Sequence, residues 1–139
     1  MKKLSLYIFL ILIFCNVGFT TPMWKISDDW ICNPKLHTKI KVDGTVVGIN
    51  ELAVTQTIDF ENSKITSSTG RIGKIIEKFY ITNSNQKYVE NIMIIDWKGW
   101  GKYSKLITHD LKTDEYWNWK SSGMARGTIY SSFSKCKPL

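Results

Sequence analysis

The residues best suited to chemistry in this chain are aromatic rings and lysines that lie together in one short segment, WKGWGKY. Here Trp97, Trp100 and Tyr103 are interleaved with Lys98 and Lys102. Aromatic faces stack on bases or sugars, and ammonium groups pair with phosphate or carboxylate groups. Such a surface could bind an anionic polymer or an anionic membrane, and these five residues are the candidate ligand-binding residues; this is the alternative to the barrel hypothesis that follows.

Aromatic side chains could instead fill the interior of a small fold, because they carry the largest apolar area per residue. Trp117 and Trp119 are two residues apart, so on a strand their rings share one face. The opposite face would carry Tyr116, Asn118 and Lys120, a set whose amide and charge suit solvent, and we therefore expect the tryptophan face to point inward. A barrel that held a small apolar ligand would line its cavity with some of Trp97, Trp117, Trp119, Tyr130 and Phe133.

The two hypotheses differ at Trp100, whose ring suits either the core or the surface. Gly99 and Gly101 flank this residue and favour a turn, and turns run over the surface. We therefore expect an exposed ring. The net charge of +7 for the whole chain also favours anionic partners, although its lysines are scattered rather than grouped in a block.

Recognisable signatures of catalysis are absent from the sequence. The two histidines, His37 and His109, lie far apart, and His109 and its neighbour Asp110 would point to opposite faces of a strand. The segment TGRIGK lacks the spacing of a phosphate-binding loop and is better explained as a basic hairpin turn. We expect a non-enzymatic binding or structural protein that needs no cofactor and no metal.

Strands separated by turn residues must position these side chains. From Leu52 onward, turn signals recur every 8 to 14 residues, which predicts an all-β, single-domain antiparallel meander that curls into a small barrel or a strongly curved sheet. In the segment 72–82, helical spacing relates four apolar residues, so one short helix is an alternative there: Ile72, Ile75, Ile76 and Phe79. The β-branched and aromatic residues of the same segment favour a strand. The Gly-x-Trp signature of lipocalins is absent, and no family is assigned.

The first residues resemble a secretory signal peptide. Lys2 and Lys3 precede an apolar run over residues 4–15, and a membrane-spanning helix would need about 20 apolar residues. Cleavage after Thr20 would leave residues 21–139 as the single β domain, with a net charge of about +5 once the two lysines are removed. We expect export to a periplasmic or extracellular space; an uncleaved anchor is the alternative.

The expected export determines how the cysteines are interpreted. Cys15 leaves with the signal peptide, and Cys32 and Cys136 remain as an even pair in an oxidising compartment. We predict a disulfide between them that ties the last strand to the first. Such a bond would close a loop of about 100 residues and stabilise the fold by at most ~4.7 kcal/mol.

Overall fold

The computed structural model describes residues 20–41, 43–48, 54–125 and 128–139, with the side chains of residues 37 and 119–130 left aside. The predicted signal peptide, residues 1–20, lies outside this part of the chain except for Thr20. The described elements are the short 3-10 helix η1 (Met23–Lys25) and nine strands: β1 (Asp29–Ile40), β2 (Val46–Gly48), β3 (Gln56–Asp59), β4 (Lys64–Ser67), β5 (Ile72–Thr82), β6 (Tyr88–Trp97), β7 (Gly101–Asp110), β8 (Glu115–Ala125) and β9 (Thr128–Pro138).

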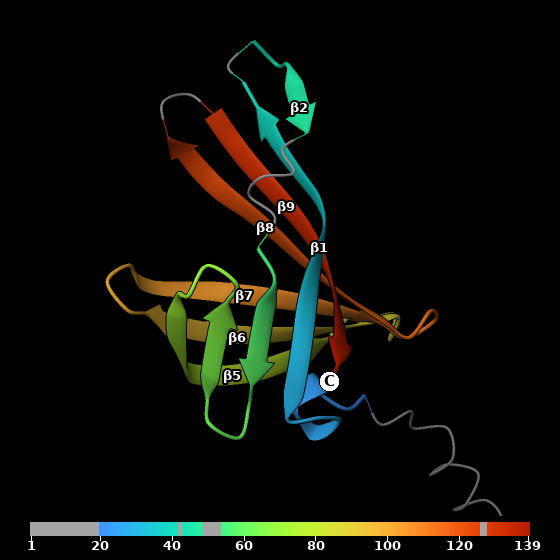
Figure 1. The fold of residues 1–139 in the computed structure, drawn as a ribbon. Coiled ribbons are helices and arrows are strands. Elements are labelled where there is room, and N and C mark those ends of the chain that lie inside the picture. The colour runs from blue at the N-terminus through green and yellow to red at the C-terminus, as the bar shows by residue number, and fades with distance from the viewer. Residues whose placement is uncertain (1–19, 42, 49–53, 126–127) are drawn as a thin grey trace, which may run out of the picture.

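The strands form an antiparallel barrel that closes on itself (Figure 1). From β3 to β9 each strand pairs with the next along the chain, and β1 pairs with both β3 and β9, so eight strands complete the circle. The short strand β2 adds to the outer part of β1. The predicted all-β meander is confirmed, and the segment 72–82 is the strand β5 rather than a helix.

Three of the strands continue beyond the barrel. β3 pairs with β1 only over Asp29–Cys32, and β7 pairs with β8 only over Glu115–Asn118. Past these points β1, β8 and β9 stay together, gain β2 at one edge and form a projecting sheet in the order β2-β1-β9-β8 (Figure 1). We call this sheet the arm. No feature of the sequence analysis predicted it.

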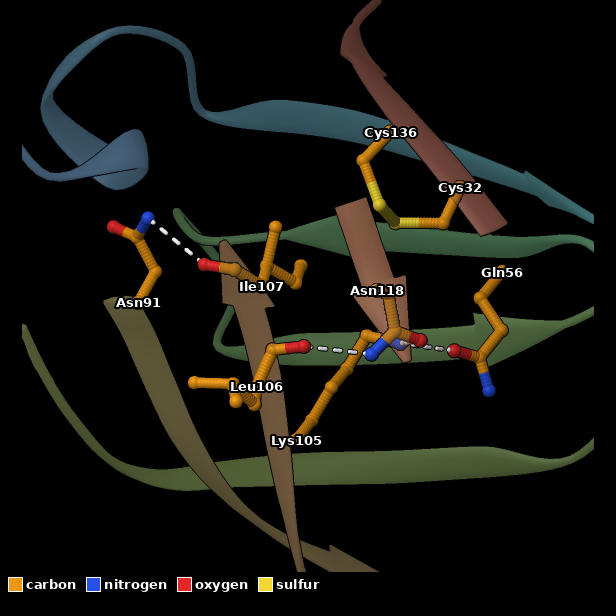
Figure 2. Close-up of a disulfide and its surroundings, with 8 residues drawn as sticks. All are labelled: Cys32, Gln56, Asn91, Lys105, Leu106, Ile107, Asn118 and Cys136. Carbon is orange, nitrogen blue, oxygen red and sulfur yellow. Dashed lines mark hydrogen bonds between the residues drawn. A yellow bond between two sulfur atoms is a disulfide. The ribbon is translucent and has the colours of Figure 1, made fainter. Parts of the chain in front are cut away.

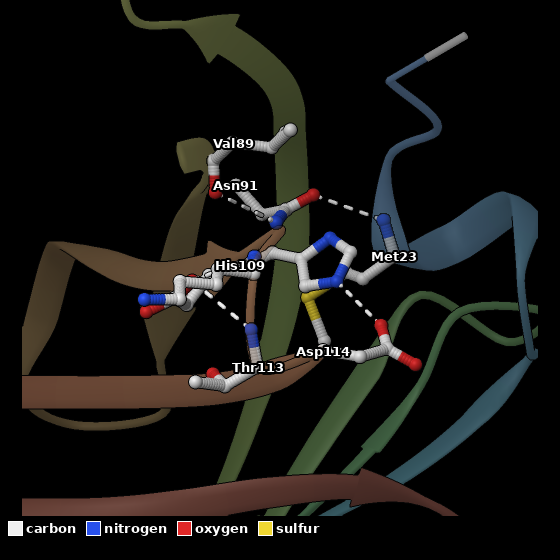
Figure 3. Close-up of polar contacts among 8 residues, drawn as sticks. Met23, Val89, Asn91, His109, Thr113 and Asp114 are labelled. Atoms are coloured by element: carbon white, nitrogen blue, oxygen red, sulfur yellow. Dashed lines mark hydrogen bonds and ion pairs between the residues drawn. The ribbon is translucent and has the colours of Figure 1, made fainter. Parts of the chain in front are cut away.

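Side chains fill the interior of the barrel. Trp30 is fully buried: its Nε1 donates to the carbonyl oxygens of Met23 at 3.2 Å and Ser27 at 3.0 Å, and its ring meets Tyr116 edge-on at 4.5 Å. Met23 N donates to Oδ1 of the buried Asn91 at 2.9 Å, so η1 closes one end of the barrel (Figure 3). Other side chains with little or no exposure complete the core: Ile58, Ile65, Val89, Met93, Ile95 and Ile107. Each such burial contributes about 1.5–3 kcal/mol relative to exposure.

The prediction that Trp117 points inward is wrong. Its neighbours Tyr116 and Asn118 are the buried residues of β8, each 6% exposed. Trp117 lies half-buried on the outside, stacked on Phe133 at 4.5 Å between ring centroids. The barrel interior beside this part of β8 is polar and accommodates the amide of Asn118. The even-numbered residues therefore point inward and Trp117 points outward, the reverse of the predicted alternation. The side chains of Trp119 and Tyr130 lie outside the described residues.

The predicted disulfide is confirmed (Figure 2). Cys32 of β1 and Cys136 of β9 are directly opposite each other in the ladder, with Cα atoms 3.9 Å apart, and both are buried. The bond joins residues 104 positions apart in the chain and fixes the seam at which the barrel closes. Because the seam joins the first long strand to the last, the bond constrains nearly the whole described fold.

Candidate functional site

An open groove of about 610 Å³ lies where the β3–β4 turn, the start of β5 and the β6–β7 turn meet. Three of the five predicted ligand-binding residues, Trp97, Lys98 and Trp100, line it. The remaining lining residues come from all three segments: Asn62, Ser63, Lys64, Ile72, Gly73, Lys74, Asp96, Gly99 and Gly101. We refer to this feature as the basic groove.

Trp97 forms the base of the basic groove. It is the last residue of β6, faces Gly73 of β5 across the ladder and packs against the hydrophobic core. A Cβ atom at position 73 would come within 3.1 Å of Trp97 Cδ2, so the ring lies directly over the glycine backbone. The missing side chain at Gly73 therefore makes room for the ring.

Trp100 lies in the turn between β6 and β7 and is 59% exposed, as its flanking glycines predicted. Trp100 N donates to Trp97 O at 2.9 Å, and the left-handed φ values of Gly99 and Gly101, +81° and +91°, allow this tight turn. The guanidinium of Arg71 lies 4.1 Å from the centre of the indole ring. This cation–π contact holds the ring at the surface and contributes about 0.5–1 kcal/mol.

A row of charged residues crosses four adjacent strands beside these rings. Lys64 of β4 is opposite Lys74 of β5, Lys74 is opposite Asp96 of β6, and Asp96 is opposite Lys102 of β7. All four are exposed, and among the described residues none of the three lysines lies within ion-pair distance of a carboxylate, although Lys64 is also opposite Asp59 of β3 in the ladder. Like charges directly opposite each other destabilise a sheet, so the Lys64–Lys74 pair favours an anion between them.

The other predicted residues lie next to the basic groove. Lys102 belongs to the charged row, and Tyr103 follows it on β7 with 56% of its surface exposed, but neither lines the groove itself. Sequence reasoning missed Lys64, Lys74 and Arg71 as site residues. The basic turn TGRIGK contains two of them, but only the strand register shows that this turn lies beside Trp100.

A second, smaller pocket of about 390 Å³ lies near the other end of β7, where β7 turns into β8. Beside it, His109 Nε2 contacts Asp114 Oδ1 at 2.7 Å (Figure 3). The imidazole also stacks on Tyr116, with 4.0 Å between the ring centroids. Burial, together with the charge of Asp114, raises the pKa of Tyr116 to about 12. Charges of both signs line this pocket, and Lys135 already pairs with Glu115, so it offers less to an anion than the basic groove.

The described residues contain no group of three or more histidine, cysteine, aspartate or glutamate side chains placed to hold a metal ion. Within the same residues, no helix has the length and apolar character needed to cross a membrane. Comparison with known proteins found no family model, no curated protein and no solved structure that matches the chain. The geometry of the basic groove is therefore the feature from which a function can be inferred.

Proposed function

We propose that this protein is a non-enzymatic binding module that holds an anionic polymer along the basic groove. The observation that carries the proposal is the row Lys64–Lys74–Asp96–Lys102, which lies beside the rings of Trp97 and Trp100 and contains three lysines that form no ion pair within the described residues. The polymer's phosphate or sulfate groups would pair with the row. Its rings or sugars would stack on the exposed indole of Trp100.

The barrel interior is a less suitable place for a ligand. Its volume is occupied by core side chains such as Trp30, Met93 and Ile95, which are at most 1% exposed. The basic groove lies at the surface, and the second pocket, although Trp30 contributes to its lining, is also lined by exposed residues such as Asp114 and Lys137. A small apolar ligand inside the barrel, the other hypothesis from the sequence, would have to displace well-packed residues.

The disulfide supports the export that the first residues predict. Disulfides form and persist in oxidising compartments, and the Cys32–Cys136 bond joins the two cysteines that would remain after cleavage. We propose that the module acts outside the cytoplasm. An anionic polymer of that environment would then be its partner.

The strength of binding should depend steeply on salt. Each phosphate contact made by a lysine or arginine releases counterions, and for single-stranded DNA the slope of log K against log salt is about −0.7 per contact. Three lysines and Arg71 would give a slope of about −2 to −3. Stacking of one base or ring on Trp100 would add about 1–3 kcal/mol that depends little on salt.

The test is a salt series with immobilised heparin and, separately, with single-stranded DNA. Lys74→Gln should lower the salt concentration of elution and reduce the slope by about one contact, whereas Trp100→Ala should weaken binding without changing the slope. Lys112→Gln is the matched control, because Lys112 is also exposed but lies in the β7–β8 turn at the other end of β7.

Comparison of the two columns separates sulfate from phosphate as the preferred group. If Lys74→Gln and Lys112→Gln shift elution equally, net charge alone explains retention and the proposal fails. It also fails if wild-type protein is not retained on either column at low salt. Binding to anionic vesicles but to neither polymer would assign the groove to a membrane instead.

A further inference from the structure

Among the described strands, none pairs with one edge of β7 over most of its length. β7 pairs with β6 from Gly101 to Asp110, but β8 pairs with β7 only over residues 107–110. β8 then turns away from β7 into the arm (Figure 1). In the part of the chain that the structure describes, residues 101–106 therefore have a ladder on one side only.

The direction of the backbone groups along this edge follows from two side-chain hydrogen bonds. Ile107 O accepts from Nδ2 of Asn91, which lies on β6, at 3.2 Å. Leu106 O accepts from Nδ2 of Asn118, which lies on β8, at 2.7 Å. Because successive residues of a strand point their backbone groups to opposite sides, the N–H and C=O of Ser104 and Lys102 face the vacant edge.

A buried polar network fixes the point at which β7 and β8 separate. Lys105 Nζ donates to Asn118 Oδ1 at 2.8 Å and to Gln56 Oε1 at 2.6 Å, while the amide nitrogen of Asn118 is bound to Leu106 O (Figure 2). The Asn118 side chain thus takes the place of the next backbone bond between the two strands. Lys105 is only 8% exposed, so this arrangement is part of the packed interior rather than a frayed end.

We propose that the vacant edge of β7, residues 101–106, binds an extended acidic peptide as an additional antiparallel strand. Strand addition of this kind uses backbone hydrogen bonds for affinity and alternate side chains for specificity. Lys102 is exposed on one face of the edge and Leu106 is 41% exposed on the same face. The fitting strand therefore carries a carboxylate opposite Lys102 and an apolar residue opposite Leu106.

Charge complementarity selects an acidic strand. Lys98 and Lys102 lie at the start of the edge, and Arg71 contacts Trp100 in the same turn. Asp96, the acidic residue nearby, is opposite Lys102 on β6, which is the side of β7 away from the vacant edge. The inference does not depend on the proposed function. A polymer in the basic groove would contact side chains, whereas a peptide on this edge would bond to the backbone of Lys102 and Ser104.

The probe is the capped peptide acetyl-Val-Ser-Thr-Val-Glu-Thr-amide, which places valine opposite Leu106, threonine opposite Ser104 and glutamate opposite Lys102 in antiparallel register. Amide hydrogen exchange of the oxidised full chain is followed by NMR. The Lys102 and Ser104 amides should exchange about tenfold more slowly when the edge is nine-tenths occupied. The Tyr103 amide, which already faces β6, should not change. The same peptide with lysine in place of glutamate should bind more weakly.

The variant Ser104→Pro removes an N–H that points to the vacant edge and not to β6, so it should fold and fail to bind the peptide. Ser104→Ala is the matched control and should bind normally. Both variants should elute from heparin like the wild type, which separates this inference from the proposed function. If Ser104→Pro does not fold, the peptide is changed instead. N-methylation of the threonine that lies opposite Ser104 removes the peptide N–H that would donate to Ser104 O.

The proposal is overturned if no protection of Lys102 and Ser104 appears with the peptide, or if Ser104→Pro or the N-methylated peptide still binds. Protection of these amides without peptide that rises with protein concentration would instead assign the edge to a second copy of this chain.

Discussion

Replacing Gly73 with alanine tests how tightly the barrel packs beneath the basic groove. An alanine Cβ would come within 2.6 Å of Ile95 Cγ2 and 2.9 Å of Ile65 Cγ2, both on buried side chains of the flanking strands. Carbon atoms in favourable contact are about 3.5–4.0 Å apart, so both side chains would have to move by about 1 Å. The Trp97 ring, 3.1 Å from the new atom, would also be lifted.

The expected loss of stability is the difference between two effects. Overpacking of a filled core costs about 1–3 kcal/mol. Replacing glycine by alanine also restricts the unfolded chain, which returns about 0.4–1 kcal/mol. We therefore expect Gly73→Ala to lower the free energy of unfolding by about 1–2 kcal/mol. It should also weaken retention on heparin, because Trp97 forms the base of the groove.

Urea denaturation followed by tryptophan fluorescence measures the first effect, and the heparin salt series measures the second. Gly44→Ala is the control: its φ of +81° makes alanine strained, but no atom of the described residues lies within 4 Å of the new Cβ. It should lower stability without changing the basic groove. A Gly73→Ala protein as stable as the wild type, with unchanged heparin retention, would show that Ile65 and Ile95 move freely and would refute the packing argument.

Four further outcomes are expected. Protein from an exporting host should lack residues 1–20 by intact-mass measurement, and a mass that includes them would revive the anchor hypothesis. Cys136→Ala should lower the free energy of unfolding in urea by about 2–5 kcal/mol; a thiol titration that finds free sulfhydryls in the native exported protein would contradict the bond. Trp30→Ala should cost about 3–5 kcal/mol because that ring is fully buried, whereas Trp117→Ala should cost only about 1 kcal/mol for a lost surface stack, and equal urea midpoints would contradict this. The raised pKa of Tyr116, about 12, favours the neutral phenol in the folded state, so its contribution to stability is present below pH about 10 and is lost as pH rises toward about 12. An ultraviolet titration should show one tyrosine ionising near that value.

The sequence was sufficient to predict the strands, their meander and the disulfide, because these depend on local signals and on a count of cysteines. It predicted the wrong face for Trp117, since the rule that apolar residues point inward assumes an apolar interior. Here the interior at the level of β8 holds the amide of Asn118 and the ammonium of Lys105. A network between residues so far apart in the chain leaves no local pattern.

The candidate site was only partly predictable for a related reason. Trp97, Lys98 and Trp100 were found because they are neighbours in sequence. Lys64 and Lys74 lie beside these residues only because of the register of β4, β5 and β6. A shift of that register by one residue would move both lysine side chains to the other face of the sheet. The arm could not be predicted either, since nothing in the sequences of β1 and β8 shows where their partners stop.

The position of the disulfide also determines how the molecule would respond to a mechanical load. β1 and β9 run side by side from Trp30 and Pro138 in the barrel to Ile40 and Ile129 at the tip of the arm. A force that pulls the arm tips apart would unzip this ladder one pair at a time, because antiparallel strands loaded at one end open sequentially. The opening would stop at Cys32 and Cys136, because this pair is joined by a covalent bond. The strands of the arm could therefore separate while the seam of the barrel remained closed.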